Sequence, residues 1–141
     1  MESANENEAF IGTFGSPSSP RKVVVEDDGK VCYAYMLDED GNICGDVWLY
    51  NRCQTPTEPE WHERENVPFA NPASFSCQSS DFCPPRSAGE ISGEWEAGEF
   101  EVARIYLSNT YFAKLVQGAK PGWSLMAAKD GPLAQVPIEE R

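Results

Sequence analysis

Two Asp-Gly dipeptides constrain this chain more than any other feature of its sequence. Asp28-Gly29 and Asp40-Gly41 separate three segments of residues 22–51 that are rich in Val, Tyr, Ile and Trp. Asp-Gly is a preferred pair for the central positions of a type I′ turn, which joins adjacent antiparallel strands. Residues 22–51 are therefore predicted to form a three-stranded antiparallel meander.

The positions of these turns predict the register of the strands. The expected cross-strand pairs are Val25 with Cys32, Val24 with Tyr33, Tyr33 with Trp48, and Tyr35 with Asp46. One face is then aliphatic and is expected to form the core: Val23, Val25, Cys32, Ala34, Met36, Val47 and Leu49. The other face is also too apolar to lie wholly in water, and carries Val24, Tyr33, Tyr35, Leu37, Trp48 and Tyr50.

The length of 141 residues suits a single domain. Residues 1–21 combine an acidic, Asn-rich start with a run of Gly, Ser and Pro, a composition that buries little apolar surface. They are predicted to be a flexible N-terminal tail, followed by one β-rich domain over residues 22–141. The apolar side chains of Phe10, Ile11 and Phe14 are expected to dock on this domain, with docking on a partner as the alternative.

Residues 51–94 show no sustained period of 2 or 3.6, and six prolines interrupt them. They are predicted to form a long irregular segment within the domain. Its scattered aromatic residues are expected to cover the second face of the meander or to leave a groove there, and they are Trp61, Phe69, Phe75 and Phe82.

The C-terminal third of the chain returns to a β pattern. Residues 99–107 alternate and predict a strand, residues 110–117 suit a strand or a two-turn helix, and residues 123–136 predict a hairpin with Asp-Gly at its turn. The fold class is thus mainly β, either all-β or α+β with little helix. Two antiparallel meanders are expected to form a small sandwich or a partly open barrel.

The cysteines and the N-terminus predict a cytoplasmic protein. The five cysteines are odd in number and irregularly spaced, which is typical of a reduced intracellular chain, although Cys77 and Cys83 are close enough to pair. The N-terminal residues have no long apolar region of the kind found in a secretory signal, and no stretch is apolar enough for a membrane helix.

The residues typical of catalytic and metal sites are sparse. His62 is the only histidine and lies among charged residues, so no catalytic residue is assigned. The cysteines contain no CxxC pair, so no metal or other cofactor is predicted, and a metal held by Cys53, Cys77, Cys83 and His62 is the alternative. A carboxylate-dependent hydrolase is a further alternative, because Glu94, Glu96, Glu99 and Glu101 surround Trp95 and the first two are expected on one strand face about 7 Å apart.

The net charge of −12 is the clearest pointer to function. It opposes nucleic-acid binding and favours a basic protein as partner. The sequence predicts a small acidic protein-binding protein, such as a bacterial immunity protein or an inhibitor that neutralises a basic toxin or enzyme. Its expected partner-binding residues are Asp38, Glu39, Asp40, Asp46, Glu58, Glu60 and Glu63.

An alternative function uses the aromatic face of the first meander. Aromatic rings with a few polar groups are typical of small-molecule sites. The ligand-binding residues would then be Tyr33, Tyr35, Trp48 and Tyr50.

Overall fold

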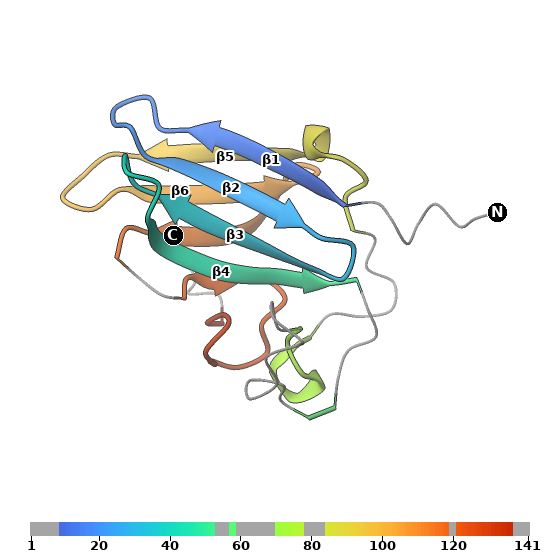
Figure 1. The fold of residues 1–141 in the computed structure, drawn as a ribbon. Helices are drawn as coiled ribbons and strands as arrows, with labels where there is room; N and C mark the ends of the chain where they lie inside the picture. The colour runs from blue at the N-terminus through green and yellow to red at the C-terminus, as the bar shows by residue number, and fades with distance from the viewer. Residues whose placement is uncertain (1–8, 53–56, 59–69, 78–83, 119–120, 137–141) are drawn as a thin grey trace.

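The computed structural model describes residues 9–52, 57–58, 70–77, 84–118 and 121–136, and it is mainly β (Figure 1). The first sheet contains β1 (Phe10–Gly15), β2 (Lys22–Asp27), β3 (Val31–Leu37) and β4 (Ile43–Asn51). The second contains β5 (Ile91–Glu96), β6 (Val102–Leu107), β7 (Thr110–Val116) and β8 (Trp123–Ser124). In the described residues between the two sheets in the sequence lie the short 3₁₀ helices η3 (Ala73–Phe75) and η4 (Ala88–Glu90). Both sheets are antiparallel meanders, which confirms the predicted fold class.

The two sheets stack as the layers of a sandwich, and the core lies between them (Figure 1). All seven residues of the predicted aliphatic face are fully buried there. The second sheet contributes alternate residues of β6 and three residues of β7, which are Ala103, Ile105, Leu107, Phe112, Ala113 and Leu115. Alternation of side chains along the strands therefore produces most of the core from both layers. The adjacent residues Phe112 and Ala113 are both buried because the register of β7 shifts by one residue at Phe112.

Residues 10–15 correct the prediction of a flexible tail over residues 1–21. They form β1, which pairs with β2 along its whole length, from Phe10 opposite Asp27 to Gly15 opposite Lys22. Phe10 and Phe14 pack against the core as expected, whereas Ile11 is 63% exposed on the opposite face. The backbone N–H and C=O groups along the edge of β2 form hydrogen bonds with residues 10–15 and so order them. The composition of this segment does not reveal that pairing. Residues 1–8 lie outside the described part of the chain.

The register between β2 and β3 differs by two residues from the prediction. Cys32 pairs with Asp27 and Tyr33 with Glu26, because the turn is centred on Gly29 and Lys30 rather than on Asp28 and Gly29. The amide of Asp28 donates to the carbonyl of Val31 at 3.2 Å, so these two residues close the turn, and the Asp28 carboxylate accepts hydrogen bonds from the amides of Lys30 and Val31. A shift of two residues leaves every side chain on its predicted face. The predicted pairs of Tyr33 with Trp48 and of Tyr35 with Asp46 are confirmed.

A β-bulge at Leu49 corrects the predicted position of Tyr50. Tyr33 pairs with Trp48 but Cys32 pairs with Tyr50, so β4 has one extra residue at this point. The bulge turns Tyr50 into the core, where its ring lies edge-on to Phe112 with the ring centroids 6.4 Å apart. Tyr50 therefore does not belong to the aromatic face.

Three predictions for the rest of the chain need correction. β5 occupies residues 91–96, so the segment predicted as irregular over 51–94 ends earlier, and β6 begins at residue 102 instead of 99. Residues 110–116 are a strand, one of the two predicted alternatives. Residues 123–136 do not form a regular hairpin, because β8 has only two residues and Trp123 bridges Gln135 in parallel. Trp61, Phe69 and Phe82 lie outside the described residues.

The C-terminal segment covers the outer edge of β4. The amide of Gly122 donates to the carbonyl of Asp46 at 2.7 Å, and the amide of Trp48 donates to the carbonyl of Leu133 at 2.8 Å. These bonds satisfy backbone groups that would otherwise attract another strand. Over the described ranges the two sheets do not close into a barrel, and no helix there has the length and apolar character to cross a membrane.

Candidate functional site

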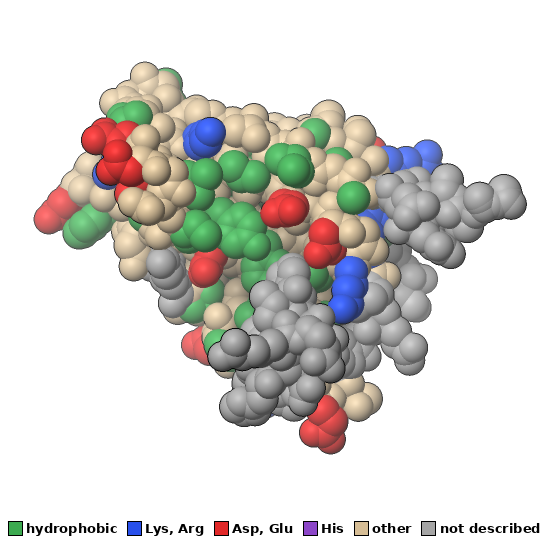
Figure 2. All heavy atoms as spheres, viewed as in Figure 1, with side chains coloured by type: hydrophobic (Ala, Val, Ile, Leu, Met, Phe, Trp, Pro, Cys, Tyr) green, Lys and Arg blue, Asp and Glu red, His purple; other side chains and the backbone are tan. Residues whose placement is uncertain are grey.

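The outer face of the first sheet brings together residues from both predicted sites. We call it the tyrosine face, and it consists of Ile11, Thr13, Val24, Glu26, Tyr33, Tyr35, Asp46 and the fully buried Trp48. The register arranges them in two rows across the strands, Ile11–Glu26–Tyr33–Trp48 and Thr13–Val24–Tyr35–Asp46. Figure 2 shows hydrophobic side chains gathered over this sheet with acidic side chains set among them.

The aromatic residues of the face differ in accessibility. Trp48 is fully buried and Tyr33 is 8% exposed, whereas Tyr35 is only partly buried. The rings of Tyr33 and Tyr35 are nearly parallel, with an interplanar angle of 7° and centroids 6.0 Å apart. Tyr35 therefore presents the ring surface that a partner can reach.

A buried polar contact holds Trp48 in place. Its indole Nε1 donates to Oδ1 of Asn51 at 2.8 Å. The same Oδ1 accepts from the amide of Asn71, while Nδ2 of Asn51 donates to the carbonyl of Asn71 at 2.9 Å. Each of these buried polar groups therefore has a partner, and together they fix the position of the Trp48 ring on the tyrosine face.

Two carboxylates border the tyrosine pair. Glu26 is exposed and lies opposite Tyr33 on β2, and Asp46 is partly buried and lies opposite Tyr35 on β4. Burial, together with smaller effects of the negative charges of Glu26 and Asp46, raises the pKa of Tyr35 to about 12. Burial likewise raises the pKa of Tyr33, with contributions from Tyr35 and Asp46. Both phenols are therefore neutral near pH 7, and the charge of the face comes from its carboxylates.

The predicted partner-binding residues Asp38, Glu39 and Asp40 form the turn between β3 and β4. The Asp38 carboxylate accepts hydrogen bonds from the amides of Asp40 and Asn42, both at 2.9 Å. Gly41 has φ of +84°, a left-handed conformation in which glycine carries no steric cost. The turn is thus ordered, and it exposes the carboxylates of Glu39 and Asp40.

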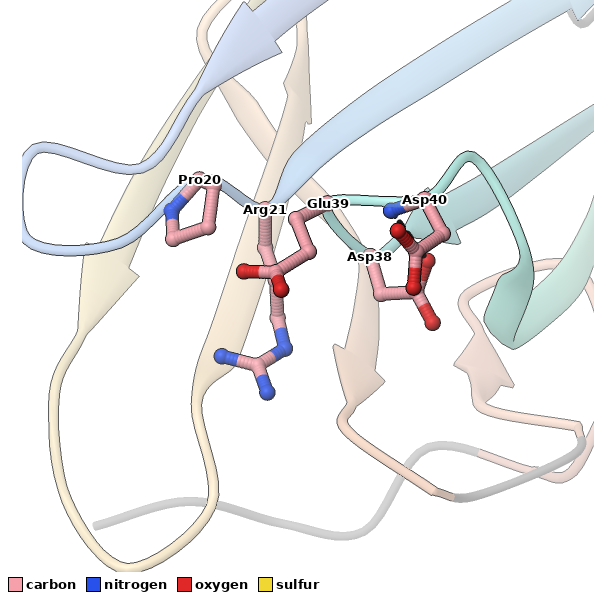
Figure 3. Close-up of a pocket in the computed structure, with 5 residues that line it drawn as sticks. All are labelled: Pro20, Arg21, Asp38, Glu39 and Asp40. Carbon is pink, nitrogen blue, oxygen red and sulfur yellow. Dashed lines mark hydrogen bonds between the residues drawn. The ribbon is translucent and has the colours of Figure 1, made fainter.

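A polar pocket of about 260 Å³ lies beside this turn (Figure 3). Pro20 and Arg21, which directly precede β2, line it together with Asp38, Glu39 and Asp40 of the turn between β3 and β4. Arg21 also forms an ion pair with Glu101 at 3.1 Å. The pocket therefore places the carboxylates of the turn beside the guanidinium of Arg21, which is already paired with Glu101.

The remaining predicted partner-binding residues divide into three groups. Asp46 lies on the tyrosine face, Glu58 is exposed, and Glu60 and Glu63 lie outside the described residues. Sequence reasoning missed Glu26 and Ile11 as members of the face. Glu26 belongs to an acidic run next to a turn, and its pairing with Tyr33 places it on the face. Ile11 lies in the segment taken as a tail, and its pairing with Glu26 places it there.

The acidic residues around Trp95 do not converge on one point. Glu94 accepts a hydrogen bond from Tyr106 at 3.0 Å, and Glu96 pairs with Arg104 at 2.8 Å on the exposed face of the second sheet. Glu101 is 6% exposed and accepts hydrogen bonds from Ser16 and Ser19. These three carboxylates are therefore engaged separately.

The described cysteines Cys32, Cys44 and Cys77 are all free thiols. Burial raises the pKa of Cys32 far above its ordinary value, so its thiol is protonated. Within the described ranges, no three His, Cys, Asp or Glu side chains lie close enough together to hold a metal ion. Cys53, Cys83 and His62, from the alternative metal site, lie outside those ranges.

No family model, curated protein or solved structure matches this chain. The tyrosine face and the acidic turn are therefore the features of this chain that bear on its function. Both lie on the first sheet and its turns, which carry exposed or partly exposed carboxylates.

Proposed function

We propose that this protein is a small acidic binding protein that recognises a basic protein partner. The observation that carries this proposal is the tyrosine face, where partly buried apolar and aromatic side chains are bordered by Glu26 and Asp46. Such a protein acts by occupying its partner, as an immunity protein or an inhibitor of a basic toxin or enzyme does.

The arrangement of the face supports protein binding. Interfaces between proteins typically have an apolar or aromatic centre and a polar rim. Here Ile11, Val24 and Tyr35 supply apolar surface, and the carboxylates supply the rim. The paired strands and the hydrogen bonds around Trp48 fix the side chains of this face before a partner binds, which lowers the entropy cost of association.

The net charge and the acidic turn support a basic partner. The turn exposes Glu39 and Asp40, and no described residue forms a salt bridge with either of them. Exposed charges of one sign steer an oppositely charged partner and raise the association rate. We expect Asp38, Glu39 and Asp40 to act mainly on this rate.

The alternative of a small aromatic ligand has weaker geometric support. Trp48 is fully buried and Tyr50 faces the core, so two of its four predicted residues offer no ring surface. The hydrolase alternative has little support as well, because Glu94 and Glu96 are occupied by separate partners.

We also propose a cytoplasmic location. Free thiols at Cys32, Cys44 and Cys77 suit a reducing compartment.

The test is affinity capture from a lysate of the source organism, at low and at high salt, followed by binding kinetics with the purified partner. We expect a basic protein that is retained at low salt and released at high salt. The variant Asp38→Asn/Glu39→Gln/Asp40→Asn should lower the association rate by roughly tenfold. Retention of no protein, or of a partner whose binding ignores salt, contradicts the proposal.

A matched control separates local charge from total charge. The variant Glu94→Gln/Glu96→Gln/Glu99→Gln removes the same number of carboxylates from exposed positions on and next to the second sheet. It should change the association rate much less than the turn variant does. Equal effects of the two variants would show that net charge, rather than the first sheet, drives association.

A further inference from the structure

We propose that Tyr35, Glu26 and Asp46 form a subsite for an arginine side chain of the basic partner. This inference rests on the proposed function, since it specifies what the partner places on the tyrosine face. It names the chemical group that the partner places on this face, which net charge alone does not identify.

The register places the three groups at neighbouring positions on one face of the sheet. Asp46 lies directly across from Tyr35 on β4, and Glu26 lies across from Tyr33, the ring that stacks beside Tyr35. Directly opposed residues in an antiparallel sheet have Cβ atoms about 5 Å apart. The tyrosine pair therefore has a carboxylate on each neighbouring strand.

The rings provide a surface for a flat cation. Their planes are nearly parallel, with the ring centroids 6.0 Å apart, and Tyr33 in turn lies across from Trp48, whose indole is hydrogen-bonded to Asn51. A guanidinium stacks on such a ring through its planar face and donates hydrogen bonds to carboxylates from its edge. An ammonium group has no planar face, so arginine fits this combination better than lysine.

The charges around the rings favour a cation over an anion or a neutral group. Asp28, Glu26 and Asp46 all act on the phenol of Tyr35 and raise its pKa, in addition to the larger effect of burial. Among the described residues of β2, the outward-facing cation is Lys22, opposite Leu37 at the far end of the strand, and Lys30 lies in the turn that follows β2. The carboxylates of Glu26, Asp28 and Asp46 outnumber Lys30 near the tyrosine pair, so the complementary partner group is positive.

Apolar side chains complete the subsite. Val24 is partly exposed opposite Tyr35, and Ile11 is 63% exposed opposite Glu26. The methylene groups of an arginine side chain cover apolar surface of this kind while the charged end reaches a carboxylate. A partner segment with an arginine next to an aliphatic residue therefore matches the face.

The experiment uses the full chain and a fluorescently labelled decaarginine peptide at low salt, with decalysine as the comparison. We expect decaarginine to bind more tightly than decalysine. Tyr35→Leu, which leaves the charge unchanged, should weaken decaarginine binding by roughly threefold, and Tyr35→Phe should restore most of the affinity because it keeps the ring. Tyr111→Leu, on the outer face of the second sheet, is the matched control and should have no effect.

A second measurement does not depend on any variant folding. Nα-acetyl-argininamide is titrated into the isotopically labelled protein, with the neutral citrulline analogue as control. The arginine compound should shift the ring resonances of Tyr35 and the resonances of Val24, and the citrulline compound should not. Equal shifts with both compounds, or shifts confined to residues 38–40, would overturn the subsite.

The outcomes separate this inference from the proposed function. If decaarginine binding depends on the acidic turn but is unchanged by Tyr35→Leu and by Asp46→Asn, the subsite is wrong and the acidic binding function stands. If decaarginine does not bind the wild-type protein at low salt, both are wrong. Thermal melting of each variant verifies that the fold is retained.

Discussion

The carboxylate of Glu101 lies 3.1 Å from Nη1 of Arg21, a residue eighty positions earlier in the chain. The hydroxyl of Ser16 donates to the same carboxylate at 2.6 Å, and Ser18 and Ser19 also donate to it. The loop between β1 and β2 is thus fastened to the residue just before β6. A segment whose composition predicts flexibility is ordered by one buried acid.

Removal of this acid should destabilise the fold. Glu101→Ala leaves Arg21 and three serine hydroxyls without their acceptor, and we expect a loss of about 2–3 kcal/mol in the free energy of unfolding. Urea unfolding measures the change. Glu99→Gln, at an exposed position two residues away, is the control and should be nearly neutral. Equal stability of the two variants would mean that the fastening contributes nothing.

The same acid should contribute to the pH dependence of stability. Burial raises the pKa of Glu101, but the hydrogen bonds from Ser16, Ser19, Arg21 and Ser18 outweigh it, so the pKa is lowered overall. A carboxyl whose pKa is lowered on folding stabilises the protein above its unfolded pKa of about 4.3, and this stabilisation is lost as the pH falls through the folded pKa. Unfolding free energies measured between about pH 6 and pH 3 should therefore fall more steeply for the wild type than for Glu101→Gln. Parallel curves contradict this assignment.

A buried ion pair closes the opposite end of the first sheet. The carboxylate of Asp27 accepts hydrogen bonds from Tyr50 at 2.7 Å and from the amide of Gly29 at 2.8 Å, and it pairs with Arg52. Arg52→Met should cost about 3 kcal/mol, because it leaves the charge of Asp27 buried without its cation. In a double-mutant cycle, Asp27→Asn/Arg52→Met should lose less stability than the two single variants added together. Simple additivity would show that the two side chains are not coupled.

The contact between β1 and β5 requires a glycine at position 93. A Cβ atom on Gly93 would lie 2.0 Å from the ring of Phe14, which packs edge-on against Trp95 with the centroids 6.2 Å apart. Gly93→Ala should therefore lower the melting temperature through a steric clash worth about 2 kcal/mol. Gly98→Ala, with no neighbouring atom nearer than 3.7 Å to its added Cβ, is the control.

A second variant identifies the cause of that loss. Adding Phe14→Ala to Gly93→Ala removes the ring that the new methyl group meets, so Gly93→Ala should cost much less in this background. An unchanged cost would place the effect in the backbone of β5 instead of in the contact with β1.

The thiols should differ in reactivity. Cys32 is fully buried and its pKa is raised by that burial, whereas Cys77 is exposed. Alkylation of the native protein with iodoacetamide, followed by peptide mass mapping, should therefore modify Cys77 and leave Cys32 unmodified until the protein is denatured. Modification of both at equal rates would contradict the described core.

The members of the tyrosine face were predicted from the sequence only in part. The predicted pairing of Tyr35 with Asp46 is confirmed, and this pair joins a residue of the predicted aromatic site to one of the predicted acidic site. Glu26 was missed because it was counted with the acidic residues of the turn instead of with the strand, and Ile11 was missed because β1 was taken as part of a tail. Tyr50 was wrongly included because the bulge at Leu49 reverses the alternation that follows it.

The sequence by itself determined the two-sheet β class and the seven aliphatic side chains of the first meander that face the core. These follow from local turn chemistry and from an alternation of period two, and both depend only on neighbouring residues. Only the tertiary structure decided the pairing of β1, the position of the bulge, and the contact of Glu101 with Arg21. These features are stabilised by contacts between residues far apart in the chain, so the local residue pattern around each residue does not identify its partner.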